Sequence, residues 1–245
     1  MSFEQRLLRP IRRRLLGLQH KRRYREHLVG PDAEREMRIV HLFIDRQRSA
    51  LDVGVHLGMY TRHFARYARS VIGFEANPES ASLVRQALQG IATIEWVALS
   101  SESGHGTLRV PLLGVDGTEP ALGTLSEANK LQGRPHREVQ VPTRRLDDFE
   151  LPPVGFVKID VEGHEEAVLQ GGERLLERDR PSYMIEVEER HNPGSVTRVI
   201  QFFEQRKYIA LFFDGTLLKG VHQMTRLNWM PSSDTYLNNF FFVPA

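Results

Sequence analysis

Short apolar segments alternate with segments of helical apolar spacing along most of the chain. Apolar side chains three and four residues apart, as at Tyr60, Phe64 and Tyr67, are typical of half-buried helices. The predicted strands are 50–55, 71–74, 91–99, 156–160, 183–187, 208–213 and 236–243, and the predicted helices are 32–45, 57–67, 78–89, 164–176 and 195–205. Strands joined by crossover helices form a mainly parallel sheet with helices on both faces. The pattern predicts one doubly wound α/β domain.

Residues 100–152 interrupt this alternation. Gly, Ser, Pro and Thr are dense there, and two short segments, 107–112 and 138–141, alternate between apolar and polar residues. Such alternation favours extended strands. We expect an insertion that carries a hairpin or edge strands over the domain, and not a linker between domains.

Composition narrows the function classes. The 245 residues are 40% hydrophobic and 26% charged, which is typical of a globular domain, and the longest apolar run, 208–213, is too short to span a bilayer. The chain has no cysteine, which excludes disulfide scaffolds, cysteine zinc sites, iron–sulfur clusters and a thiol nucleophile. The N-terminus lacks a secretory signal pattern, so a cytoplasmic location is expected.

Charge is concentrated at the N-terminus. Residues 1–27 carry nine Lys or Arg and two Glu, a net charge of +7, so the remainder sums to −5. We expect a basic amphipathic arm at 1–30, with a helix over 3–19 that Pro10 would kink, before a single domain at 31–245. The arm would dock on the body or a second subunit, or contact the inner face of an anionic membrane. Nucleic acid is not an expected partner.

The ends of the first two strands carry residues suited to an adenosine-containing cofactor. A glycine such as Gly54, in the turn after a first strand, lets a ligand approach the backbone closely. Glu75 ends the second strand, where an acid can accept hydrogen bonds from ribose hydroxyls. A dinucleotide fits poorly, because Gly-x-Gly-x-x-Gly is absent and Asp52 lies where a pyrophosphate would bind. An acid there suits the amino group of a methionine moiety.

Several motifs together resemble the FkbM family of S-adenosylmethionine-dependent methyltransferases, over roughly residues 45–190. They are Asp52-Val53-Gly54-x-x-x-Gly58-x-Tyr60-Thr61, Phe74-Glu75-Ala76-Asn77-Pro78, Ala98-Leu99-Ser100, Arg145-Leu146-Asp147-Asp148-Phe149 and Lys158-Ile159-Asp160-Val161-Glu162-Gly163-His164-Glu165. The resemblance implies a Rossmann-like class I methyltransferase sheet with strand order 3-2-1-4-5-7-6, mainly parallel with a final antiparallel strand. It also implies S-adenosylmethionine as cofactor.

The cofactor residues follow from these motifs. Where the family usually has Ala-Asn, this chain has Val55-His56, and the imidazole of His56 is a candidate replacement for the asparagine's polar contact. The expected cofactor-binding residues are Asp52, Gly54, His56, Gly58, Tyr60, Thr61, Glu75, Ala98, Leu99 and Asp160.

Lys158 lies in an otherwise apolar strand, where a buried ammonium group needs a partner. Asp52 on the first strand and Glu186 on the fifth are the nearest candidates. A structural ion pair and a direct ligand contact both remain open.

Asp160, Glu162 and His164 are the expected catalytic residues. Methyl transfer to an alcohol needs in-line approach of the oxygen and removal of its proton. A divalent cation held by these residues with Glu186 and Glu188 is an alternative that we do not favour. Glu162 has a second interpretation, because an acid also stabilises the positive N-terminal end of a helix.

The hypothesis is an S-adenosylmethionine-dependent methyltransferase that methylates a hydroxyl of a sugar, glycan or secondary metabolite. The acceptor class follows from the resemblance alone, and residues 100–152 and 216–238 are expected to wall its pocket. The alternative is a non-catalytic module that docks on a membrane or partner through its basic arm. A nicotinamide-dependent oxidoreductase is disfavoured by the missing third glycine and by Asp52.

Overall fold

A computed structural model describes residues 19–26, 28, 34–112, 123–225, 228 and 236–245. Within these residues the main sheet has eight strands in the order β10-β9-β11-β8-β7-β1-β2-β3. Their bounds are β1 (Ser49–Val53), β2 (Val71–Glu75), β3 (Thr93–Trp96), β7 (Val154–Ile159), β8 (Ser182–Glu186), β9 (Tyr208–Phe213), β10 (Leu218–Gly220) and β11 (Asn239–Pro244). Apart from the short edge strand β10, this is the expected order 3-2-1-4-5-7-6. The final strand is antiparallel to both its neighbours, as expected.

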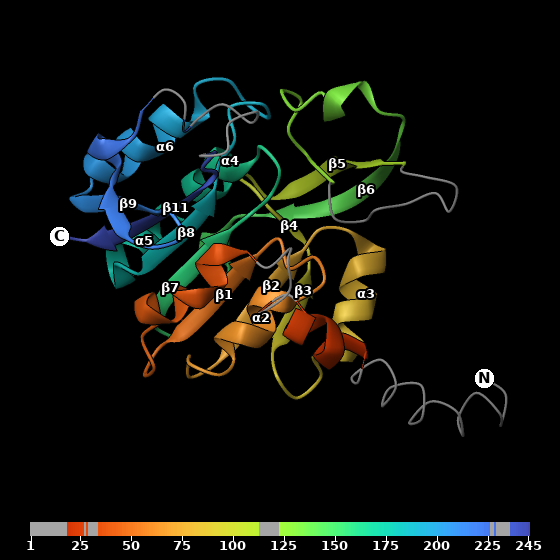
Figure 1. Ribbon diagram of the computed structural model, residues 1–245. Helices are drawn as coiled ribbons and strands as arrows, with labels where there is room; N and C mark the ends of the chain where they lie inside the picture. Colours follow the sequence, from red (N-terminus) through yellow and green to blue (C-terminus); the bar gives the residue numbers. More distant parts are fainter. Residues whose placement is uncertain (1–18, 27, 29–33, 113–122, 226–227, 229–235) are drawn as a thin grey trace, which may run out of the picture.

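Helices cover both faces of the main sheet (Figure 1). The helix α2 (Met59–Phe64) and the turns η1 (Arg35–Arg38) and η2 (Val40–Phe43) pack on one face, and α3 (Pro78–Ala87) packs beside them on β3. The opposite face is covered by three helices, α4 (Glu165–Gln170), α5 (Glu173–Asp179) and α6 (Ser195–Glu204). The fold is therefore the predicted doubly wound α/β arrangement.

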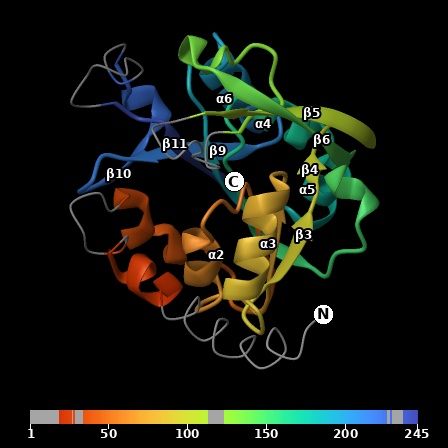
Figure 2. The same cartoon turned by 90° about the vertical axis from the view of Figure 1, so that its right-hand side faces the viewer.

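A smaller sheet lies over the carboxyl ends of the central strands. It contains β4 (Ala98–Leu99), β5 (Gly104–Pro111) and β6 (His136–Arg144), and β5 and β6 pair as an antiparallel hairpin. Figure 2 shows this hairpin above α2 and α3. Three single turns of 3₁₀ helix complete the described elements, η4 (Leu131–Gly133), η5 (Leu146–Asp148) and η6 (Val221–Gln223). The expected insertion is thus a second sheet built onto the domain.

One predicted strand is divided between the two sheets. The sequence predicted a continuous strand over 91–99, but β3 pairs with β2 in the main sheet, while β4 pairs with β6 in the small one. The Val97 N–H still donates to the Glu75 carbonyl oxygen at 3.1 Å, so the chain leaves the main sheet directly after Val97. The bend carries Ala98 and Leu99 over the end of β2.

Three other predictions differ in detail from the structure. In the described part of the predicted helix 32–45 the chain forms two short 3₁₀ turns, η1 and η2, whose buried Met37 and Val40 pack in the core. Leu57 does not belong to a buried stripe: it is 37% exposed and precedes the first residue of α2. The last strand begins at Asn239, since Tyr236 turns away to donate its hydroxyl hydrogen to Glu188.

The predicted arm helix over residues 3–19 lies almost entirely outside the described residues. Residues 19–26 are helical and pack against α2, with His20 and Tyr24 buried. Among the described helices, none combines the length and the apolar character needed to cross a membrane.

Candidate active site

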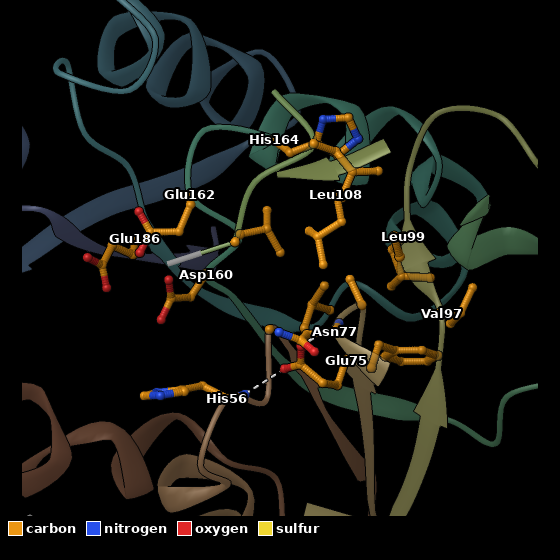
Figure 3. A pocket seen from close by; sticks show the side chains of 18 residues that line it. His56, Glu75, Asn77, Val97, Leu99, Leu108, Asp160, Glu162, His164 and Glu186 are labelled. Carbon is orange, nitrogen blue, oxygen red and sulfur yellow. Dashed lines mark hydrogen bonds between the residues drawn. The ribbon is translucent and has the colours of Figure 1, made fainter. Parts of the chain in front are cut away.

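A cavity of about 220 Å³ lies at the carboxyl ends of β1, β2 and β7, beneath the small sheet. Figure 3 shows the carboxyl groups of Asp160, Glu162 and Glu186 on one side of it and Glu75, Val97 and Leu99 on the other. The lining residues are Val53, Gly54, His56, Phe74, Glu75, Ala76, Asn77, Val97, Ala98, Leu99, Leu108, Gly123, Leu125, Asp160, Val161, Glu162, His164 and Glu186. A cleft outside the carboxyl ends of parallel strands is the usual ligand site of this architecture.

The turn after β1 forms the floor of the cavity and is tightly constrained. Gly54 has φ +84°, and a Cβ atom there would lie 1.8 Å from the Asp160 carbonyl oxygen. No other residue fits that contact without moving β1 from β7. The next residue in the left-handed region is His56, with φ +50°, and its backbone N–H donates to Glu75 Oε2 at 2.8 Å.

Glu75 is held at the cavity wall by two backbone donors. Its Oε2 accepts from the His56 N–H, and its Oε1 accepts from the Asn77 N–H at 2.8 Å. Burial raises the pKa of Glu75 to about 7, against the two backbone hydrogen bonds, and the charges of Asp52 and Asp160 add to the rise. Each carboxylate oxygen keeps a lone pair for a further donor, so Glu75 can accept hydrogen bonds from a diol in the cavity.

Asn77, which belongs to the motif Phe74-Glu75-Ala76-Asn77-Pro78, also lines the cavity. Its Oδ1 accepts from the Glu79 N–H at 3.0 Å, so Asn77 caps the N-terminus of α3. Its buried Nδ2 has no acceptor among the described residues. An unpartnered buried donor at a cavity is suited to a ligand acceptor, because leaving it unsatisfied costs about 1–3 kcal/mol. The sequence signal for Asn77 was its place in that motif, two residues after Glu75.

Lys158 pairs with neither of the residues that the sequence favoured. Its Nζ donates to Asp160 Oδ2 at 2.8 Å and lies 4.8 Å from the centre of the Tyr60 ring. Burial opposes the charge of Lys158, but the carboxylates of Asp160 and Asp52 outweigh it and raise its pKa. The expectation of a direct Asp52 or Glu186 pair is therefore wrong. Asp160 lies two residues after Lys158, directly beyond the end of β7, and residues two apart in an extended segment point to the same face.

Asp52 lies behind the cavity. It faces α2, where it accepts a hydrogen bond from Thr61 Oγ1, and its Oδ1 has no donor among the described residues. Burial raises the pKa of Asp52 to about 6, although Lys158 and the Thr61 hydroxyl act in the opposite direction. Asp52 and Lys158 are register partners in β1 and β7, so their charges stabilise adjacent strand ends.

Three acidic side chains line the opposite wall, and two of them have raised pKa values. Burial, then the charges of Asp160 and Glu188, raise the pKa of Glu162 to about 8. Burial and the charge of Asp160 likewise raise the pKa of Glu186 well above its usual value. Since carboxylates this close disfavour each other's ionisation, this wall carries less negative charge near pH 7 than three acids suggest.

The insertion fixes the backbone of Glu162. That residue has φ +54°, and its carbonyl oxygen accepts from Thr124 Oγ1 at 2.7 Å and Asn129 Nδ2 at 2.8 Å. Its carboxyl group lies 3.2 Å from His191 Nε2. Neither the two insertion residues nor His191 carried a signal in the sequence, because nothing along the chain connects them with residue 162.

His164 lines the upper part of the cavity near Leu108 (Figure 3). Its Nε2 lies 3.0 Å from Ser100 Oγ, and burial lowers its pKa below the usual 6.5. The imidazole is therefore neutral near pH 7 and can accept a proton.

The metal alternative has no matching geometry in the described part of the chain, where no three His, Asp or Glu side chains converge as metal ligands. Glu188, one of the proposed ligands, instead accepts hydrogen bonds from the Arg190 guanidinium and the Tyr236 hydroxyl.

The structure brings most of the expected site residues together. Lining the cavity are Gly54, His56, Glu75, Ala98, Leu99, Asp160, Glu162 and His164. The other four lie behind the β1–α2 turn or within α2 and do not line it: Asp52, Gly58, Tyr60 and Thr61. None of the described residues of 216–238 lines the cavity, although Asn238 Nδ2 donates to the lining residue Glu186 at 2.8 Å.

The strand order and the cavity position define the fold of the class I S-adenosylmethionine-dependent methyltransferases. A family model described as the methyltransferase FkbM domain matches residues 52–210. The chain therefore belongs to the FkbM methyltransferase domain family. The match runs from the end of β1 to the middle of β9 and includes every lining residue of the cavity.

Solved structures of similar fold are distant in sequence. Methyltransferase FkbM from Methylobacillus flagellatus is 14% identical with a TM-score of 0.51, over 82% of this chain and 44% of that protein. This chain thus spans less than half the length of that relative. An O-methyltransferase from Bacillus cereus, solved with SAH, is 13% identical with a TM-score of 0.49, over 93% of this chain and 89% of the other. No curated protein matches this sequence.

Proposed function

We propose that this protein transfers the methyl group of S-adenosylmethionine to a hydroxyl oxygen of a sugar, glycan or secondary metabolite. The observation that carries the cofactor part of the proposal is the buried Glu75 carboxylate, held by two backbone N–H groups at the wall of the cavity. Membership of the FkbM methyltransferase domain family supports the same reaction class.

The lining residues fit an adenosine-containing cofactor. Glu75 would accept the ribose hydroxyls, and the unpartnered Asn77 Nδ2 offers a donor beside it. Phe74, Val97 and Leu99 also line the cavity, and their apolar side chains suit the faces of a purine. When bound, S-adenosylmethionine supplies an electrophilic methyl group on a sulfonium centre.

His164 and Asp160 are the candidates for accepting the proton of the acceptor hydroxyl. His164 is neutral near pH 7, because burial lowers its pKa, and one ring nitrogen can take up a proton. Asp160 presents a carboxylate whose charge is balanced by Lys158. Glu162 is a weaker base near neutral pH, since its pKa of about 8 keeps it mostly protonated.

The acceptor would enter beneath the hairpin of the small sheet. Leu108 and Leu125 from the insertion line the cavity together with the acids Asp160, Glu162 and Glu186. A lining that combines apolar side chains with carboxyl groups suits a molecule that carries both hydroxyl groups and an apolar ring face, as sugars do.

Calorimetry on the full chain tests the cofactor class. Titration with S-adenosylhomocysteine should give saturable binding, and titration with NAD should give none. Binding of NAD alone would overturn the proposal. If S-adenosylhomocysteine binds but no methyl transfer to glycosides or polyketide alcohols is detected with labelled S-adenosylmethionine, a non-catalytic role is favoured instead.

A further inference from the structure

The N-terminal segment reaches the turn that floors the cavity. His20 belongs to the helical residues 19–26 and is buried against α2. Its Nδ1 accepts a hydrogen bond from Arg62 Nε at 2.7 Å, and its Nε2 lies 2.7 Å from the Leu57 carbonyl oxygen. A side chain from outside the domain core therefore contacts the backbone between His56 and Gly58.

The two contacts determine the tautomer of His20. The Arg62 guanidinium can only donate, so Nδ1 must accept, and the ring hydrogen must be on Nε2. Nε2–H then donates to the Leu57 carbonyl. Burial, with the charge of Arg62, lowers the pKa of His20 to about 4. The imidazole thus stays neutral, and keeps both hydrogen bonds, at ordinary pH.

Gly58 leaves the space that His20 occupies. Its φ is +72°, and a Cβ atom there would lie 3.3 Å from His20 Nε2 and 2.7 Å from Leu88 Cδ1. The second glycine of the turn motif therefore faces the N-terminal segment and α3. The sequence assigned this glycine to the cofactor, and in the structure it also gives Leu88 and His20 room to pack against the turn.

A second contact fixes the same segment to α2. The Tyr24 hydroxyl lies 2.9 Å from His63 Nδ1, and Arg66 donates to that hydroxyl at 3.2 Å. Since Tyr24 follows His20 by one helical turn, both side chains lie on the face that meets α2. The docking of the segment, and hence of His20, does not depend on a single bond.

We propose that His20 is a positioning residue for the cofactor turn. It holds the Leu57 carbonyl, which keeps the turn in the left-handed conformation that aims the His56 N–H at Glu75 Oε2. The N-terminal segment thereby completes the ribose-binding wall. The inference rests on the proposed function for its ligand, but the contact with the turn can be measured without any ligand.

Three substitutions separate positioning of the turn from docking of the segment. His20→Gln keeps a donor near the Nε2 position, His20→Asn keeps an acceptor near Nδ1 for Arg62, and His20→Ala keeps neither. Arg22→Ala, on the exposed side of the same segment, is the control. In calorimetry, the Ala and Asn variants should bind S-adenosylhomocysteine about tenfold more weakly than wild type, whereas Gln and the control stay within about threefold.

Hydrogen exchange in the absence of ligand provides the second readout. The His56 amide, protected by Glu75, should exchange about tenfold faster in the Ala and Asn variants and at the wild-type rate in the Gln variant and the control. Equal exchange and equal affinity in all variants would overturn the proposal. So would a purely structural pattern, in which Asn and Gln behave alike. If wild type binds no S-adenosylhomocysteine, the proposed function fails, but the exchange result still decides the role of His20.

Discussion

Replacing Glu75 with glutamine should change how stability and cofactor affinity depend on pH. Burial raises the pKa of this carboxyl from 4.5 to about 7 in the folded protein. The folded state therefore holds the proton more tightly than the unfolded chain. As pH rises from about 4.5 to about 7, the unfolded chain ionises first, and the free energy of unfolding falls.

The pKa difference sets the size of the effect. At about 1.4 kcal/mol for each tenfold change in proton affinity, ionisation of Glu75 removes roughly 3 kcal/mol of unfolding free energy across this range. Glutamine cannot ionise, so that part of the pH slope should vanish in Glu75→Gln. The variant also leaves the His56 or Asn77 N–H without an acceptor, which costs about 1–3 kcal/mol at every pH. The change of unfolding free energy with pH, and not its value at one pH, therefore isolates the ionisation of Glu75.

Urea unfolding between about pH 5 and pH 8 measures the slope. Asp52, Glu162 and Glu165 have raised pKa values as well, so the wild-type curve contains their contributions and the comparison with Glu75→Gln removes them. Glu177→Gln, at an exposed position on α5, is the matched control and should keep the wild-type slope. Parallel curves for wild type and Glu75→Gln would refute the assignment of a raised pKa to Glu75.

Cofactor affinity supplies an independent check of the same reasoning. If the ionised carboxylate accepts the ribose hydroxyls, affinity should follow the ionised fraction, which falls about tenfold between pH 8 and pH 6 for a pKa of about 7. Wild type should therefore bind S-adenosylhomocysteine about tenfold more weakly at pH 6 than at pH 8. Glu75→Gln should bind ten- to a hundredfold more weakly than wild type at about pH 8, with little dependence on pH. An affinity that is flat with pH in wild type would exclude this role for Glu75.

Three further predictions concern the turn, the chemistry and the arm. Gly54→Ala should lose more than about 3 kcal/mol of unfolding free energy. Gly90→Ala is the control, since Gly90 has φ +77° but open space around it, and it should lose about 1 kcal/mol. Equal losses in urea unfolding would contradict the close contact between Gly54 and Asp160. Asp160→Asn or His164→Ala should lower methyl transfer about 10²–10⁴-fold, and His164→Ala should retain S-adenosylhomocysteine affinity; near-full turnover in both would disprove the assigned roles. Loss of activity with EDTA, restored by a divalent cation, would favour the metal alternative. If the basic arm binds anionic membranes, the full chain should co-sediment with anionic vesicles at low salt more than a chain that begins at Gln19 does; equal partitioning would rule this out.

The layers of this protein and one wall of its site could be predicted from the sequence. The spacing of apolar residues predicted the strands and helices, because burial on one face imposes that period wherever the chain packs. The order of the strands came from the family resemblance. The residues next to strand ends were also predictable: Gly54 and Glu75 line the cavity because the carboxyl ends of parallel strands lie at one edge of a sheet.

The polar contacts between separate elements could not be predicted in this way, because they depend on how those elements pack. The Lys158–Asp160 pair is an exception, since residues two apart in an extended segment point to the same face and the pair could be predicted from the sequence. His20 reaches a carbonyl 37 residues away, and Thr124 and Asn129 hold Glu162 from the insertion. Hydrogen bonds of this kind have no period along the chain. They arise where separate elements converge, so a one-dimensional pattern carries no trace of them.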